Sequence, residues 1–173
     1  MMSRPRHAAG FTLVELMVAV TIMGVLAALA APAFNDVLLG NKLGGYANDF
    51  VASAQLARSE AIKRNTTVNL CASANGTTCA TSGGWQQGWI VVVPSTPAQV
   101  LNVQNALASG FRMTETGSGL LSIPFYGSGV GAVTSATIKL CRATPSVGKQ
   151  DRSIAISATR SISVTKTATG SCS

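Results

Sequence analysis

The stretch Gly10-Phe11-Thr12-Leu13-Val14-Glu15-Leu16 opens a long apolar run. From Phe11 to Ala31 this run has 21 residues, and Glu15 is its only charged residue. As an α-helix it extends about 32 Å at ~1.5 Å per residue, which is enough to cross the hydrocarbon core of a bilayer. The sequence therefore predicts a membrane-spanning helix, with the rest of the 173 residues in one further domain.

Basic residues precede this run closely but do not follow it closely. Arg4 and Arg6 come before it, and Lys42 is the first basic residue after it. Because flanking positive charge stays in the cytoplasm, this asymmetry predicts a cytoplasmic N-terminus and a C-terminal part across the membrane. An ordinary signal peptide, cut after Ala28-Leu29-Ala30, and a plain single-span anchor both share these features.

Glu15 distinguishes a third interpretation from these two. A carboxylate inside an apolar run costs roughly 2.5–3.5 kcal/mol on insertion scales, so its presence needs a reason. The segment Gly10–Leu16 resembles the type IV prepilin signature. The resemblance implies that a prepilin peptidase cuts between Gly10 and Phe11 and that Phe11 becomes N-methylated. It also implies that Glu15 pairs with the terminal amine of its own chain or of a neighbouring subunit. A buried amine and a buried carboxylate are far less costly together than alone.

The helix is expected to continue beyond Pro32, which can kink a helix without ending it. Apolar residues recur there at alternating spacings of three and four, which predicts an amphipathic part over residues 35–65, ending near Arg64-Asn65. Three glycines, at positions 40, 44 and 45, predict a bend or a frayed turn. We expect a globular head to pack on the apolar stripe, which consists of Leu39, Leu43, Tyr46, Phe50, Ala54, Ala57 and Ala61.

After residue 65 the composition becomes typical of β-structure, with short runs of Thr, Val, Ile and Ser broken by turn residues. One long helix followed by many short strands predicts an α+β fold with antiparallel sheets packed on the helix. We expect a cleaved leader (1–10), a transmembrane helix (11–34), an amphipathic helix (35–65) and a β-rich head (66–173). The predicted strands are Thr66–Cys71, Gly88–Val93, Gln99–Val103, Phe111–Thr114, Leu120–Ile123, Ala136–Cys141, Ser153–Ser157 and Ser161–Thr165.

The four cysteines suggest structural disulfides in an oxidising compartment. Their spacing suits neither a zinc site nor a Cys-x-x-Cys redox motif. Three pairings are possible, and local closure favours Cys71–Cys79 with Cys141–Cys172. His7, the only histidine, precedes the expected cleavage site, so the mature chain has no histidine for a metal site or a Ser-His pair. With no recognisable carboxylate pair either, we expect no enzyme activity, no catalytic residue, no metal and no cofactor.

Four segments of the later chain occur in a set order. They are Ala57-Arg58-Ser59-Glu60-Ala61-Ile62, Val68-Asn69-Leu70-Cys71, Gly84-Trp85-Gln86-Gln87-Gly88-Trp89 and Phe125-Tyr126-Gly127. Together with the leader they resemble the GspH/FimT/FimU group of minor pilins and pseudopilins. The resemblance implies a long helix packed against two β-sheets, other pilins as partners, and a role in priming or capping a pilus. The two tryptophans are interpreted as packing residues in preference to a binding platform.

The C-terminal region is basic. The formal charge is +7, and without Arg4 and Arg6 the chain retains 11 basic and 6 acidic residues, or +5; residues 139–173 alone carry +5. Such a patch is typical of nonspecific contact with phosphates. FimT-type proteins bind DNA through a Gly-Arg-x-Arg motif, of which Thr159-Arg160-Ser161-Ile162 retains one arginine. The candidate DNA contacts are Lys149, Arg152, Arg160 and Lys166.

Strand alternation works against two of these candidates, because it places Arg152 and Arg160 on the side of the core-facing isoleucines. The alternative is that the charges keep the head soluble or contact neighbouring pilins. The sequence as a whole favours a type IV minor pilin in the inner membrane, with a periplasmic head that later enters the pilus. Nonspecific binding of double-stranded DNA for natural transformation is a further hypothesis. A pseudopilin of a type II secretion system is the alternative.

Overall fold

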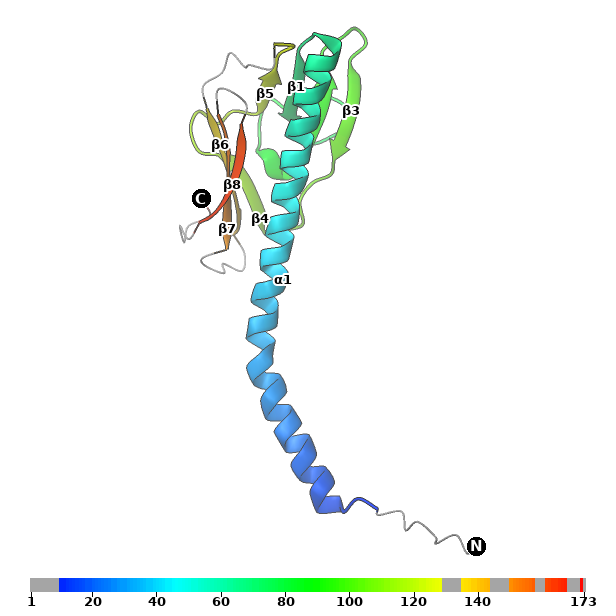
Figure 1. Cartoon of the computed structure of the whole chain (residues 1–173), viewed down its shortest axis with the longest axis vertical. Helices are drawn as coiled ribbons and strands as arrows, with labels where there is room; N and C mark the ends of the chain where they lie inside the picture. The colour runs from blue at the N-terminus through cyan, green and yellow to red at the C-terminus, as the bar shows by residue number, and fades with distance from the viewer. Residues whose placement is uncertain (1–9, 129–134, 144–149, 158–160, 168–171, 173) are drawn as a thin grey trace, which may run out of the picture. The chain divides into compact units, whose positions relative to one another are not determined.

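The computed structural model describes residues 10–128, 135–143, 150–157, 161–167 and 172, with the backbone alone at residues 30–33. Within them, a long helix, α1 (Leu13–Arg64), precedes eight strands (Figure 1). The chain divides into two compact units, residues 1–38 and residues 39–173, so α1 contributes to both. The later elements are β1 (Val68–Ala72), η1 (Trp85–Gln87), β2 (Trp89–Val93), β3 (Gln99–Gln104), β4 (Phe111–Glu115), β5 (Ser122–Phe125), β6 (Ala136–Arg142), β7 (Asp151–Ile156) and β8 (Ile162–Thr167).

The strands form two antiparallel sheets in the second unit, which we call the head. Sheet A has the order β3-β2-β1-β5, and sheet B has the order β4-β6-β7-β8. Figure 1 shows α1 running along both sheets within the head. The predicted α+β class and all eight predicted strands are confirmed, with strand ends that differ by at most two residues from those expected.

The apolar stripe of α1 forms one side of a single core. Six of its seven predicted members are buried, Tyr46 is partly buried, and Ala47 joins them. The opposite side of this core comes from the inward residues of both sheets, such as Leu70 on β1, Val91 on β2 and Ile138 on β6. The period of the stripe therefore places one face of α1 against two sheets at once.

Phe50 packs α1 against sheet A. Its ring lies edge-on to Trp85 at 5.2 Å and to Trp89 at 5.4 Å between centroids, and all three residues are fully buried. The indole nitrogens are also satisfied: Trp89 Nε1 donates to Ser53 Oγ at 2.9 Å, and Trp85 Nε1 donates to the Leu120 carbonyl at 2.9 Å. Both tryptophans are thus packing residues, as the sequence indicated, and they form no surface platform.

The helix ends where the sequence predicted, and Asn65 accounts for its termination. Asn65 has a φ of +49°, its N–H donates to Ile62 O, and the N–H of Thr66 donates to Ala61 O. This is the Schellman arrangement, in which a left-handed residue closes the last turn. Beside it, the hydrogen bond from Arg64 to Glu60 holds the pKa of that carboxyl below its ordinary value.

The frayed turn expected near the helix glycines is absent, because α1 is continuous through them and through Pro32. Leu39, Leu43 and Ala47 are buried around these glycines, and this packing outweighs their low helix propensity. Gly44 and Gly45 have no atom within 4 Å of an added Cβ, so packing in the head does not require them.

We predict that Gly44→Ala with Gly45→Ala stabilises the head by about 1–2 kcal/mol, since each glycine in a helix interior costs about 0.5–1 kcal/mol relative to alanine. Urea unfolding of the full chain in detergent, followed by tryptophan fluorescence, measures this. Gly88→Ala is the matched control and should destabilise, because Gly88 has a φ of +105° and an added Cβ lies 2.6 Å from Gln104 O. An unchanged midpoint in the double variant contradicts the prediction.

Candidate functional site: the N-terminal helix and the basic strand pair

The expected cleavage site lies in an exposed segment directly before α1. Gly10 and Phe11 precede the first helical residue, Leu13, and Phe11 is 84% exposed. A peptidase needs an accessible, non-helical bond, and the bond between Gly10 and Phe11 meets both requirements. Cleavage here and N-methylation of Phe11 remain predictions.

Thr12 and Glu15 together organise the start of the helix. Thr12 Oγ1 accepts a hydrogen bond from the Glu15 N–H at 3.2 Å, and Thr12 O accepts from the Leu16 N–H, so Thr12 is the N-cap. A glutamate three residues after a threonine N-cap is the pattern of a capping box. Sequence reasoning assigned Glu15 only to assembly and missed this local role, although the Thr-x-x-Glu spacing contained the signal.

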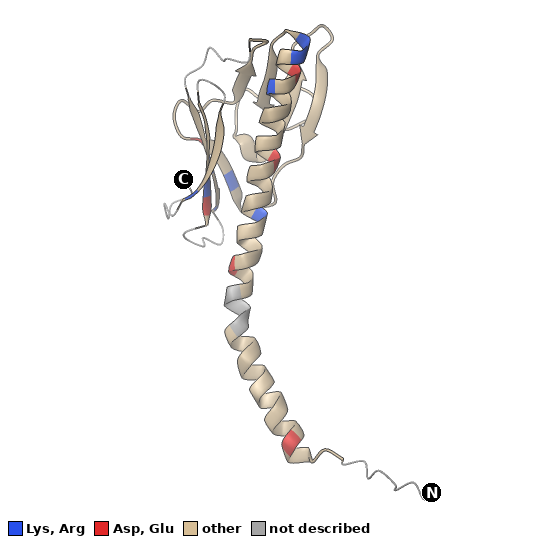
Figure 2. Ribbon diagram, viewed as in Figure 1, with Lys and Arg blue, Asp and Glu red and all other residues tan. Residues whose placement is uncertain are grey.

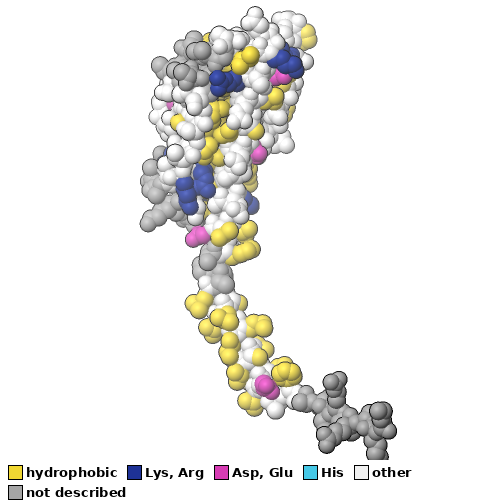
Figure 3. Space-filling view, viewed as in Figure 1, with side chains coloured by type: hydrophobic (Ala, Val, Ile, Leu, Met, Phe, Trp, Pro, Cys, Tyr) yellow, Lys and Arg dark blue, Asp and Glu magenta, His cyan; other side chains and the backbone are white. Residues whose placement is uncertain are grey.

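The first compact unit exposes its apolar side chains. Between Glu15 and Asp36 α1 has no charged residue (Figure 2). The large apolar side chains from Leu13 to Leu29 are each 51–74% exposed, as the yellow side chains of Figure 3 show. By length and composition α1 is one helix able to cross a membrane. Its exposed apolar surface requires a non-aqueous environment, which a bilayer or neighbouring helices provide.

Two disulfides join the pairs that local closure favoured, Cys71–Cys79 and Cys141–Cys172. Cys71 lies on the outward face of sheet A, in a small apolar cluster with Ile90 and Val92. The loop closed by Cys71–Cys79 therefore starts from the side of sheet A that faces away from α1. The second disulfide ties Cys172, close to the C-terminus, to β6.

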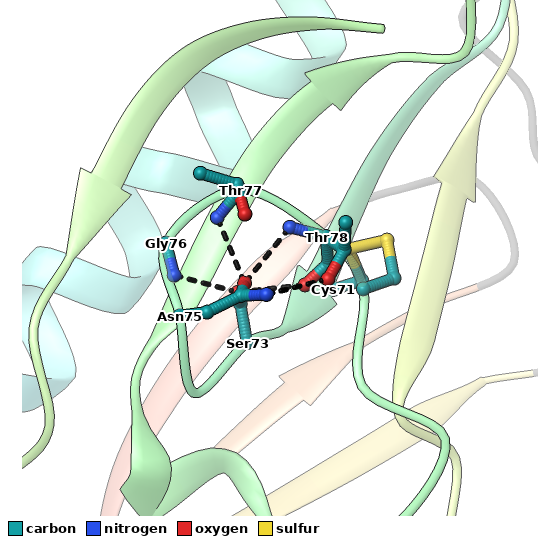
Figure 4. The surroundings of a disulfide bond; sticks show 7 residues. Cys71, Ser73, Asn75, Gly76, Thr77 and Thr78 are labelled. Atoms are coloured by element: carbon teal, nitrogen blue, oxygen red, sulfur yellow. Dashed lines mark hydrogen bonds between the residues drawn. A yellow bond between two sulfur atoms is a disulfide. The ribbon is translucent and has the colours of Figure 1, made fainter.

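A dense polar network holds the first disulfide loop (Figure 4). Asn75 Oδ1 accepts from the N–H groups of Thr77 at 2.9 Å and Thr78 at 3.0 Å, and Asn75 Nδ2 donates to Thr78 Oγ1 at 2.8 Å. Ser73 Oγ donates to Thr78 O at 2.7 Å and accepts from the Gly76 N–H at 3.1 Å. This loop is therefore constrained by its own side chains as well as by the S–S bond.

Beside this loop lies an open pocket of about 390 Å³. Ser73, Asn75, Gln87, Gln104 and Asn105 contribute its polar lining. Its lining contains no carboxylate, lysine, arginine or histidine, so it offers no acid–base pair, and the Ser73 hydroxyl is already bonded to Thr78. The pocket does not have the groups of a catalytic site.

The candidate DNA contacts separate into two groups. Lys149 and Arg160 lie outside the described residues. Arg152 and Lys166 are described, and they are directly opposite each other in the β7–β8 register. Lys166 is exposed, whereas the half-buried Arg152 donates to three backbone carbonyls: Gln150 O at 2.9 Å, Gly40 O at 3.2 Å and Asp151 O at 3.4 Å. Arg152 has the core-facing parity that alternation predicted, and it extends to α1 because β7 begins at the margin of the core.

The carboxylates of the head serve structural roles. Glu115 accepts from the N–H groups of Gly119 at 2.8 Å and Leu120 at 3.2 Å, which closes a turn. Asp151 is buried and lies 3.9 Å from Lys139 Nζ. Among the described residues no three His, Cys, Asp or Glu side chains cluster as a metal would require.

A capped apolar helix with one exposed glutamate, carrying a two-sheet head, defines a pilin-like protein. Residues 46–166 match the family described as Type II transport protein GspH, and residues 5–31 match the Prokaryotic N-terminal methylation motif. The chain therefore belongs to the GspH family. It is a minor pilin or pseudopilin of the class that serves type IV pili and type II secretion.

Solved structures show the same fold. The type IV minor pilin FimU of Pseudomonas aeruginosa is 22% identical with a TM-score of 0.60, over 77% of this chain and 96% of that one. A second crystal form of FimU is 21% identical with a TM-score of 0.59, over 76% of this chain and 100% of that one. The minor pseudopilin EpsH of Vibrio cholerae is 12% identical with a TM-score of 0.52, over 72% and 97% of the two chains.

We predict that Cys71→Ser with Cys79→Ser lowers the free energy of unfolding by less than the ~2.5 kcal/mol that chain entropy assigns to so short a loop. The Asn75 network should retain part of the loop order. Adding Asn75→Ala should then cost about 1 kcal/mol, because it removes the hydrogen bonds that Asn75 makes to Thr77 and Thr78. Urea unfolding of the three chains measures both steps, and equal midpoints with and without Asn75→Ala contradict the role of the network.

Proposed function

We propose that the chain is a minor pilin of a type IV pilus, made as a precursor and cut between Gly10 and Phe11. N-methylation of Phe11 follows, and before assembly the subunit is anchored in the inner membrane with its head in the periplasm. It then primes or caps the assembly of other pilins. Prepilin peptidase is its processing partner.

The observation that carries this proposal is the exposed carboxylate of Glu15 in an apolar helix. Glu15 has no basic partner among the described residues, and only its N–H, not its carboxylate, is engaged by Thr12. Cleavage after Gly10 creates a positive amine on Phe11, one residue before the N-cap. A helix N-terminus disfavours a positive charge, and a carboxylate in the first turn offsets it. Glu15 thus compensates a terminal amine, either its own or one on a neighbouring subunit.

We predict that Glu15→Ala leaves processing intact but removes the subunit from sheared pili, whereas Gly10→Val leaves the leader attached. Mass spectrometry of membrane fractions measures cleavage and methylation, and immunoblots of sheared pili measure incorporation. Asp36→Asn, at the other carboxylate of the first unit, is the matched control and should behave as the unmodified chain. Normal incorporation of the Glu15→Ala subunit would contradict the proposed pairing of Glu15 with a terminal amine.

A type II secretion pseudopilin is the alternative within the same class, and the similarity to EpsH favours it. Deleting the gene in its host separates the two. Loss of surface pili with normal secreted protein supports the pilus role. Loss of secreted protein with normal pili supports the secretion role.

Nonspecific capture of double-stranded DNA for transformation is a second candidate function. The charge of +5 in residues 139–173 and the exposure of Lys166 support it. Against it, the Arg152 guanidinium is hydrogen-bonded to backbone carbonyls.

If DNA is bound, the logarithm of the association constant should fall linearly with the logarithm of the salt concentration. Lys166→Ala should make that slope shallower by about 0.9, the value for one phosphate contact. Fluorescence anisotropy with a labelled duplex and the full chain in detergent measures this. Lys63→Ala, which removes an exposed cation at the far end of α1, is the control. An equal slope in the Lys63→Ala and Lys166→Ala chains would exclude Lys166 from DNA contact.

A further inference from the structure

The Arg152 guanidinium is held in place without being neutralised. Its three acceptors are backbone carbonyls, which bind a cation but carry no net charge. The adjacent carboxylate does not compensate it either. Successive residues of a strand point to opposite faces, so Asp151 faces the other side of sheet B, where it lies near Lys139.

Two further cations share this level of the head. Lys166 is exposed and directly opposite Arg152 on the same face of β7–β8, an arrangement of like charges that destabilises a sheet. Lys42 is exposed on α1, two residues after Gly40, whose carbonyl binds Arg152. Residues two apart on a helix do not face each other, so Lys42 adds positive charge near this pair without contacting it. Figure 3 shows Lys and Arg side chains on both sides of α1 at the lower end of the head in that view. We call Lys42, Arg152 and Lys166 the basic cluster.

None of these three cations forms an ion pair with an Asp or Glu side chain, and the six Asp and Glu residues are all among the described residues. Arg152 and Lys166 are like charges directly opposite each other in the sheet, and an anionic partner would offset the cost of placing them together. The exposed amines of Lys42 and Lys166 suit phosphate oxygens, which accept charge-assisted hydrogen bonds, and the Arg152 guanidinium adds its positive charge while it stays bonded to the backbone carbonyls.

The membrane anchor is covalently continuous with the head, so the layer of lipid headgroup phosphates is close to the basic cluster. A hydrocarbon core of about 30 Å takes about 20 helical residues, which places its far end near Pro32 if it begins at Leu13. Gly40 is eight residues further, at most about 12 Å along the helix, whatever angle the helix adopts. Headgroup layers fill about 5–7 Å of that length, so Gly40 lies at most about 5–7 Å of helix beyond the headgroups, which is less than one Debye length.

We infer that the basic cluster binds the phosphate groups of anionic phospholipids in the membrane that anchors the chain. The contact holds the head on the bilayer surface until the subunit enters the filament. This inference rests on the proposed membrane anchoring. The membrane is the favoured partner because the anchor keeps lipid phosphates permanently near the cluster, whereas duplex DNA must first be delivered to the head.

The two tryptophans provide the measurement, because Trp85 and Trp89 are the only ones in the chain and both lie in the head. The full chain is inserted into nanodiscs that carry a trace of dansyl-labelled headgroups. Energy transfer from tryptophan to dansyl then reports how close the head lies to the lipid surface. We expect at least about twofold more transfer in discs with 30% phosphatidylglycerol than in phosphatidylcholine discs, and loss of the difference in 0.5 M salt.

Lys42→Gln with Lys166→Gln should abolish that difference, whereas Lys63→Gln, the matched removal of an exposed lysine elsewhere, should preserve it. Arg152 stays unchanged, because its replacement would also remove a contact with α1. Equal transfer in both lipids overturns the inference while leaving anchoring intact. A chain that fails to enter the discs overturns anchoring and the inference together. If the double variant loses duplex DNA binding but keeps the lipid-dependent transfer, the cations serve DNA and the inference is wrong.

Discussion

The edge-on packing of Phe50 against Trp85 and Trp89 is the contact through which α1 and sheet A share one core. Rings of this size each bury 150–250 Å², so roughly this much apolar area per ring depends on one turn of the helix. Truncating a buried Phe to Ala commonly costs 3–5 kcal/mol, a large part of the net stability of a small domain. Because η1 carries Trp85 and β2 begins with Trp89, the position of the helix and the register of the first sheet are set together.

Sheet B packs on the same helix through apolar contacts, to which hydrogen bonds are added. The Tyr46 ring meets Phe111 edge-on at 5.2 Å, and the Tyr46 hydroxyl accepts the Ala108 N–H. One turn below Leu43, the Arg152 guanidinium bonds to the Gly40 carbonyl. Hydrogen bonds therefore add to the apolar contacts where α1 enters the head. The buried side chains of Leu39, Leu43 and Ala47 carry the packing there, which explains why glycines are tolerated between residues 40 and 45.

The sequence allowed the α+β class, the eight strands, the apolar stripe and the helix end at Asn65 to be predicted, because each follows from a local period or a local turn residue. The contacts of Arg152 were not predictable. Alternation placed its side chain on the core face, but only the structure shows that β7 begins at the edge of the core, where a guanidinium reaches backbone carbonyls. Glu15 was assigned to assembly from the family resemblance, and its place beside the Thr12 cap was missed although the Thr-x-x-Glu spacing indicates it.

The two compact units meet opposite requirements with one continuous helix. The first unit exposes its apolar side chains, so it requires a bilayer or other helices around it. The second unit buries its apolar stripe within its own sheets and is closed by two disulfides. In the proposed assembly, transfer from membrane to filament would change the partners of the N-terminal half of α1. The core around Phe50 would stay intact, because it lies entirely within the second unit.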